Sequence, residues 1–253
     1  MTVVDTHCHA GTTKYEPVES LLYHMGASGV DKAVLIQHAG ITDNTYLVES
    51  LQKHPGRFAA AMLVEPEDDG TRIRHWAAQG MGGIRLPSTS RARAADPLAH
   101  WRTAAALDLV VSAPCTPAAL LGPEFTEVVD TFPDLRIVIE HLGGVGRDAA
   151  PPYDEFKRML GLAERPGLTI KLPGFGEFCP VPLPDGYPPL ARMAVEAFGP
   201  QRVMWGSDFP PVSSREGYAA SLEVPRQYFS DLSADEQAAL FGGTALAVWG
   251  FPQ

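Results

Sequence analysis

The 253-residue sequence is poor in cysteine, in positive charge and in long apolar runs. Its three cysteines, Cys8, Cys115 and Cys179, form no CxxC pair, so a disulfide framework is not expected. Twenty Lys and Arg residues against thirty Asp and Glu residues give a formal charge of −10, which disfavours nucleic acid and anionic membranes as partners. No apolar run reaches the ~18 residues of a membrane span, and residues 1–7 do not resemble a secretory signal. These absences predict a cytoplasmic protein.

Short apolar runs instead alternate with longer amphipathic stretches along the chain. The runs are rich in Val, Ile or Leu and too short for helices, so they are predicted to be strands. They cover residues 3–6, 32–37, 58–64, 82–86, 109–113, 136–140, 168–172 and 202–206. Helices are predicted at about 17–28, 43–54, 67–79, 96–106, 116–131, 153–165, 188–198 and 234–248. Capping residues at Asp96, Thr116 and Ser233 support three of these starts.

Predicted strands begin about every 24–34 residues, which is the length of one βα unit. Eight such units in this length predict the α/β class and a single (β/α)8 TIM barrel over residues 1–253. An open doubly wound sheet would instead be expected to carry a Gly-rich phosphate turn after its first strand. That turn here reads THCHAG. The irregular segments 173–189 and 210–217 follow strands, so both are expected on the face where barrel enzymes build their sites.

The first candidate site residues are His7 and His9, at the end of the first predicted strand. Alternate strand residues point to the same side, so both imidazoles are expected to project into the barrel mouth. Together they can bind a divalent metal or hydrogen-bond one substrate oxygen. Two strand-end histidines without a shared role are the alternative.

His141 and Asp208 follow the sixth and eighth predicted strands, at the same rim. Glycines after His141 permit a sharp turn, whereas Glu140 is expected to face the other way, toward a helix or an ion-pair partner. A carboxylate opposite three imidazoles can deprotonate water or hold a metal. Asp208 is therefore the best single catalytic candidate, although a capping role for Asp208 and a core role for His141 remain alternatives.

Positive charge at the rim predicts an anionic small-molecule substrate. Arg85 ends the fourth predicted strand, Arg91 and Arg93 follow it, and Lys171 lies in the seventh. Guanidinium groups bind carboxylates through paired hydrogen bonds. Arg91 and Arg93 could equally be solvated, and Lys171 could pair with an interior acid.

The motifs VDTHCH, IEHLGG and MWGSDFP, with GGIRLP and IKLPGFGEF, resemble the amidohydrolase-related branch of the amidohydrolase superfamily. Two groups of that branch are relevant. Zinc-dependent decarboxylases of unsaturated acids use the paired strand-one histidines, a strand-five histidine and the strand-eight aspartate as ligands. Lactonases similar to 2-pyrone-4,6-dicarboxylate lactonase and the sugar lactonases often need no metal and commonly carry a strand-four arginine.

The fifth predicted strand of this chain has no histidine, and the fourth has no lysine that could bridge two metals. Cys115 could replace the missing ligand, because a thiolate binds zinc well. A small buried apolar role is the alternative for this cysteine. A binuclear site is therefore not expected, and His7, His9 and Asp208 would form only a weak zinc site.

These features favour a hydrolase of a small carboxylated lactone or related cyclic ester, metal-independent or weakly metal-dependent. Asp208 is predicted to act as general base, with His7, His9 and His141 stabilising the oxyanion. Arg85, Arg91 and Lys171 are predicted to bind substrate. No cofactor is expected to be required, and His7, His9 and Asp208 are the predicted ligands if zinc or another divalent metal is present. A zinc-dependent decarboxylase and a non-catalytic metabolite-binding barrel are the alternatives. A homo-oligomer is compatible with the sequence.

Overall fold

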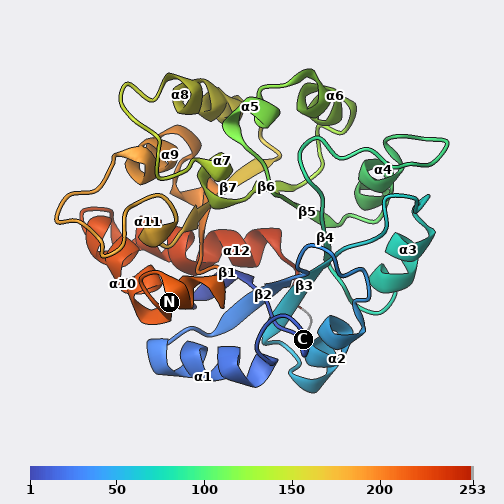
Figure 1. Ribbon diagram of the computed structural model, residues 1–253, viewed down its shortest axis with the longest axis horizontal. Coiled ribbons are helices and arrows are strands. Elements are labelled where there is room, and N and C mark those ends of the chain that lie inside the picture. The colour runs from blue at the N-terminus through green and yellow to red at the C-terminus, as the bar shows by residue number, and fades with distance from the viewer. Residues whose placement is uncertain (252–253) are drawn as a thin grey trace.

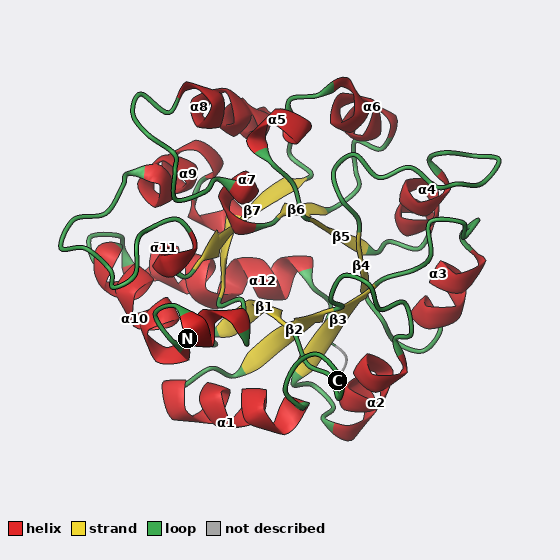
Figure 2. Ribbon diagram, in the orientation of Figure 1, coloured by secondary structure: helices red, strands yellow, loops and turns green. Residues whose placement is uncertain are grey.

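The computed structural model describes residues 1–251. These residues contain eight parallel strands, which are hydrogen-bonded in sequence order and lie at the centre of the molecule with helices around them (Figures 1 and 2). The strands are β1 (Val4–Cys8), β2 (Lys32–Ile36), β3 (Phe58–Met62), β4 (Gly83–Arg85), β5 (Val110–Ala113), β6 (Ile137–Ile139), β7 (Leu168–Pro173) and β8 (Val203–Gly206).

The helices follow the strands in the expected alternation. They are α1 (Val18–Ser28), α2 (Thr45–Lys53), α3 (Thr71–Ala77), α4 (Ala99–Ala106), α5 (Pro117–Leu120), α6 (Pro123–Thr131), α7 (His141–Gly144), α8 (Asp154–Leu160), α9 (Leu190–Phe198), α10 (Tyr218–Tyr228), α11 (Ala234–Ala238) and α12 (Thr244–Val248). Across the described part of the chain, no helix is long and apolar enough to cross a membrane.

The barrel closes where β8 meets β1. The His9 amide donates to the Phe209 carbonyl (2.7 Å), and the Asp208 amide donates to the His7 carbonyl (2.9 Å). The result is a nearly closed sheet of parallel strands with helices between them. The predicted α/β class and (β/α)8 barrel are confirmed.

Alternation along the strands divides the apolar side chains into two layers. One set packs between the strands and the surrounding helices. The other set, called the inner apolar layer below, fills the barrel interior together with the last helix, α12, which crosses the ring of strands in the view of Figure 1. The inner apolar layer consists of Val4, Val34, Ile36, Ala59, Ala61, Val110, Val138, Met204, Ala245 and Trp249.

A bulge in β1 changes this alternation just before the site. Asp5 pairs with Ala33 and Cys8 pairs with Leu35, so three steps along β1 match two along β2. A bulge of this kind redirects the side chains that follow it. Cys8 consequently packs in the outer layer, and His7 is directed toward the interior of the barrel.

The helix boundaries differ from the predicted ones where proline or glycine intervenes. The helix expected at 116–131 is split into α5 and α6 around Gly122 and Pro123, where a new N-terminus begins. The sequence did not indicate α10, because Pro225 lies inside it and proline is unfavourable within helices. The predicted caps at Thr116 and Ser233 are present. The predicted cap at Asp96 is wrong, because α4 begins at Ala99 with Leu98 as its N-cap.

Candidate active site

Three of the predicted site residues meet at the C-terminal ends of β1 and β8. The Nε2 atoms of His7 and His9 lie 3.3 Å apart. Asp208 Oδ1 lies 3.8 Å from the first of these nitrogens and 3.5 Å from the second. All three residues are buried. The structure therefore brings the two imidazoles and the carboxylate together in one buried cluster.

The tautomer of neutral His9 is set by a backbone carbonyl. His9 Nδ1 lies 2.7 Å from the Ile36 oxygen at the end of β2, and a carbonyl can only accept a hydrogen bond. Nδ1 therefore carries the hydrogen. In the neutral ring, Nε2 then presents a lone pair toward His7 and Asp208. Tyr15 stacks on the His9 ring, with 5.1 Å between ring centroids, a contact that was not predicted from the sequence.

His7 has the opposite environment. Its Nδ1 lies 2.9 Å from Lys171 Nζ, and Lys171 is fully buried in β7. A lysine ammonium can only donate, so Nδ1 accepts and Nε2 carries the hydrogen of the neutral ring. Burial, followed by the charge of Lys171, holds the pKa of His7 well below its usual value. His7 is therefore a neutral N–H donor facing the cluster.

A polar layer lies beside these residues, formed by Arg85, Ser112, Glu140 and Lys171. Arg85 donates to both carboxylate oxygens of Glu140 (3.1 and 2.8 Å), and the Ser112 hydroxyl donates to Oε1 (2.7 Å). Burial opposes ionisation of Glu140, but Arg85 and Lys171 outweigh it and lower its pKa to about 2. Burial lowers the pKa of Lys171 to about 8. Glu140 thus faces the interior, contrary to expectation, and has an ion-pair partner, as expected.

His141 and Asp208 both occupy left-handed backbone conformations. Their φ angles are 45° and 61°, a region that is uncommon for residues other than glycine. The His141 ring lies 4.3 Å from the His7 ring, centroid to centroid, and its Nδ1 has no hydrogen-bond partner among residues 1–251. A Cβ at Gly144 would lie 2.0 Å from the Cys115 carbonyl. Only glycine therefore fits at position 144, in the turn that carries His141.

Arg215 contacts the site, although the sequence interpretation did not select it. Its Nη1 donates to Asp208 Oδ2 (3.0 Å) and also pairs with Glu177. Burial opposes ionisation of Asp208, but His9, His141 and Arg215 outweigh it and lower its pKa. The only available signal was the position of Arg215 in the irregular segment 210–217, on the predicted catalytic face.

Arg91 lies in a different environment from Arg85. Its guanidinium donates to the Glu124 carbonyl (3.0 Å) and to the Glu127 carboxylate (2.6 Å), both on α6. Arg93 similarly pairs with exposed Glu67 (3.3 Å). These two loop arginines therefore form surface ion pairs and lie outside the polar layer.

The cluster fits a metal ion only in part. The donor atoms of His7, His9 and Asp208 are near enough to bind one ion, as are those of His7, Glu140 and His141. A histidine that binds through Nε2 needs an acceptor for its Nδ1 hydrogen. His9 has one in Ile36, whereas His7 faces a cation. Cys115 belongs to neither group, and burial raises the pKa of its thiol.

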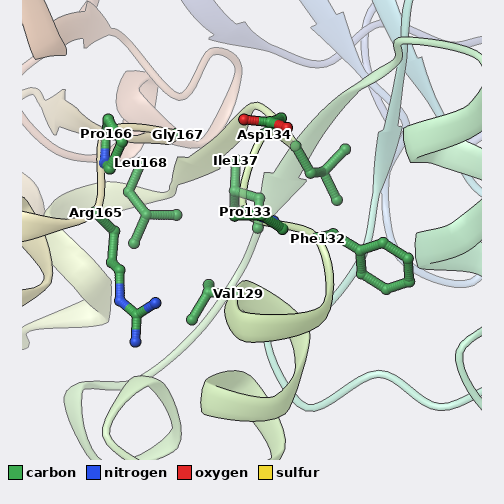
Figure 3. Close-up of a pocket in the computed structure, with 10 residues that line it drawn as sticks. Val129, Phe132, Pro133, Asp134, Ile137, Arg165, Pro166, Gly167 and Leu168 are labelled. Carbon is green, nitrogen blue, oxygen red and sulfur yellow. The ribbon is translucent and has the colours of Figure 1, made fainter.

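A separate cavity of about 130 Å³ lies at the other end of the barrel. Figure 3 shows Pro133, Ile137, Pro166 and Leu168 around it, on the segments that enter β6 and β7. Residues at the N-terminal end of a barrel usually serve stability, not catalysis. This cavity is therefore not part of the candidate site.

Comparison with known proteins identifies the class to which this barrel and its site belong. The family described as Amidohydrolase matches residues 4–251. The chain belongs to this family, and the predicted hydrolase class is confirmed at that level.

Two relatives named for an enzymatic activity are similar to parts of the chain. Over 232 residues it is 26% identical to 4-sulfomuconolactone hydrolase of Hydrogenophaga intermedia, covering 81% of this chain and 74% of that protein. Over 150 residues it is 34% identical to L-fucono-1,5-lactonase of Burkholderia ambifaria, covering 54% of this chain and 49% of that protein.

Solved structures of similar fold cover almost the whole chain. A probable 2-pyrone-4,6-dicarboxylic acid hydrolase from Acinetobacter baumannii, with citric acid bound, has a TM-score of 0.80 and 20% identity, covering 99% of this chain and all of that one. An amidohydrolase from Burkholderia multivorans with bound zinc has a TM-score of 0.79 and 22% identity, covering both chains fully. At these identities the likeness concerns the fold.

Proposed function

We propose that this protein hydrolyses a small carboxylated lactone or a related cyclic ester. The observation that carries the proposal is the buried cluster of His7, His9 and Asp208, with the His141 ring beside it. It lies at the C-terminal ends of the strands, where barrel enzymes have their active sites. Two relatives named for lactone hydrolysis support this substrate class. The proposal treats residues 1–253 as one barrel domain.

Asp208 is the general base of the proposed reaction. Its lowered pKa keeps the carboxylate ionised at neutral pH, and Oδ1 faces the two imidazoles while Arg215 holds Oδ2. In the proposed step, Oδ1 takes a proton from a water molecule as the water oxygen attacks the lactone carbonyl carbon. His9 Nε2 lies 3.5 Å from Oδ1 and is placed to help orient this water.

The His7 Nε2–H and the His141 ring are the proposed donors to the oxyanion that forms. When the tetrahedral intermediate collapses, the ring C–O bond breaks and the proton held by Asp208 passes to the departing ring oxygen. One water is consumed for each ring opened, and the product is a hydroxy acid. The carboxylate of Asp208 is regenerated for the next turnover.

Arg85 is the proposed partner of the substrate carboxylate. Two cations, Arg85 and Lys171, face one carboxylate, Glu140, so the polar layer carries one net positive charge. Arg85 Nη1 makes only a long contact, 3.5 Å to the Gln37 carbonyl, which leaves it able to bind an anion. Arg91 could contribute only by leaving Glu127, and Lys171 contacts His7.

The reaction is proposed to require no metal, with zinc or another divalent ion binding weakly at His7, His9 and Asp208. The spacing of these donor atoms favours one alternative, a zinc-dependent decarboxylase of an unsaturated acid. The Burkholderia multivorans amidohydrolase of similar fold, which has bound zinc, is consistent with this alternative. The two enzymes differ in metal content and in product.

The deciding experiment compares the wild-type protein with Asp208→Asn on a panel of sugar lactones, muconolactones and pyrone dicarboxylates. Loss of the general base is expected to lower kcat/KM by about 10²–10⁴-fold. Asp231→Asn, which removes an exposed carboxylate paired with Arg192, serves as the control and keeps wild-type kcat/KM. A chelator is expected to leave hydrolysis intact. Release of carbon dioxide that stops on chelation would support the decarboxylase, and binding without turnover would support a metabolite-binding barrel.

A further inference from the structure

Lys171 is a fully buried cation with no step of its own in the proposed hydrolysis. Its ammonium lies 2.9 Å from His7 Nδ1 and 3.4 Å from the Ser112 hydroxyl. That hydroxyl in turn donates to Glu140 (2.7 Å). The Ser112 hydroxyl thus links Lys171 to Glu140, and the hydrogen bond from Lys171 to His7 is the contact that reaches the site.

This contact reverses the usual environment of a metal-binding histidine. When a histidine binds a metal through Nε2, its Nδ1 hydrogen normally goes to a carboxylate, a carbonyl or water, and this partner orients the ring and raises its basicity. The Ile36 carbonyl fills that position for His9. For His7 the position is filled by a donor, which leaves the hydrogen on Nε2, the atom that would have to bind the metal. The lysine charge also repels a cation on the far side of the ring.

We propose that Lys171 is a positioning residue that weakens metal binding by His7 and keeps the His7 Nε2–H directed into the site. The inference deepens the proposed function by giving that N–H to the lactone carbonyl oxygen. The effect of Lys171 on metal binding does not depend on which substrate the protein uses.

The test combines zinc binding with the histidine tautomer. In the variant Lys171→Gln, the side-chain amide can accept a hydrogen bond from Nδ1, which allows Nε2 to bind zinc. Zinc affinity, measured by competition with a chromophoric chelator, is expected to rise about 10–100-fold over wild type, the usual effect of a partner at this position. Long-range ¹H–¹⁵N correlation spectra of histidine-labelled wild-type protein are expected to show the His7 hydrogen on Nε2.

Two controls locate the effect. Ser112→Ala removes the other hydrogen-bond partner of Lys171 and keeps the contact with His7, so it is expected to leave zinc affinity at the wild-type level. The double variant Lys171→Gln/Asp208→Asn is expected to lose the gained affinity, because the ion would lose a ligand. A gain that survives in the double variant would place the zinc elsewhere and overturn the proposal.

The tautomer measurement keeps the proposal testable if Lys171→Gln does not fold. A hydrogen on His7 Nδ1 in wild type, or wild-type zinc affinity equal to that of Lys171→Gln, contradicts the role of Lys171. The failure of the proposed function looks different: no lactone is opened, although the zinc affinity of the variant rises. Each inference can therefore fail without the other.

Discussion

The inner apolar layer and the polar layer of the barrel interior are built from the same strands but differ in chemistry. Val110 and Val138 belong to the inner apolar layer, and two residues further on lie Ser112 and Glu140 of the polar layer. Because residues two apart share a strand face, each of these faces is apolar toward one end of the barrel and polar toward the other. Burying charges costs free energy that apolar residues would not. The inner apolar layer thus stabilises the fold without buried charge, whereas the polar layer keeps charges that the chemistry needs and that must stay paired.

The largest expected effect comes from removing the one negative charge of the polar layer. Glu140→Gln leaves the Arg85 and Lys171 cations facing a neutral amide, and breaking a buried ion pair in this way costs about 3–5 kcal/mol. We expect the free energy of unfolding, measured by urea titration, to fall by that amount. We expect kcat/KM to fall as well, because Glu140 is linked through Ser112 to Lys171, which holds His7. One substitution in the polar layer is therefore expected to change both stability and chemistry.

The matched control for Glu140→Gln is Glu127→Gln, which breaks the ion pair with Arg91. The Glu127 side chain is 56% exposed, against 2% for Glu140, and exposed pairs contribute roughly 0–1 kcal/mol. Equal losses in the two variants would mean that the buried network has no special role in stability.

A change in the inner apolar layer is expected to affect stability alone. Trp249 directly follows α12 and is buried. A Cβ at Gly83 would lie 2.6 Å from its ring, which shows how closely the ring packs on β4. Trp249→Ala should lower the free energy of unfolding by about 3–5 kcal/mol through the cavity it leaves. The folded protein should keep wild-type kcat at low temperature. Leu246→Ala, on the exposed side of α12, should change neither quantity, and a fall in kcat for Trp249→Ala would show that the two layers are coupled.

The fold was accessible from the sequence because hydrophobic periodicity repeats in every βα unit. Each strand was predicted close to its observed position, since a short buried run needs little more than Val, Ile and Leu between turn residues. The helix α10 was missed because Pro225 lies inside it. Local preference was overruled there by packing of its buried residues against the barrel, a long-range effect that a single sequence does not display.

Of the candidate site, only the residues at strand ends could be predicted from the sequence. Alternation and strand position placed His7, His9, His141 and Asp208 at one rim, and these four residues do lie together. The contacts between distant segments could not be predicted in the same way. The bond from Lys171 to His7 spans 164 positions, and that from Arg215 to Asp208 depends on the course of an irregular loop. Charge alone did not distinguish Arg85, which joins the polar layer, from Arg91, which binds α6.

The smallest expected effects concern two helix caps of the same chemistry. The Thr116 hydroxyl accepts from the Ala119 amide at the start of α5, and the Ser233 hydroxyl accepts from the Glu236 amide at the start of α11. Removing either cap with alanine should lower the free energy of unfolding by about 0.5–2 kcal/mol. Thermal or urea denaturation of Thr116→Ala and Ser233→Ala measures this loss.

The two caps should differ in their effect on activity. The loop that carries Thr116 packs on Gly144, in the turn that positions His141, whereas Ser233 lies in a segment that contributes no residue to the site. Small displacements of catalytic groups are costly to rate, so kcat/KM should fall by up to about tenfold in Thr116→Ala and stay at the wild-type value in Ser233→Ala. An equal fall in both variants would show that activity follows overall stability, and the separation between the chemical face of the barrel and the rest of the fold would then not hold.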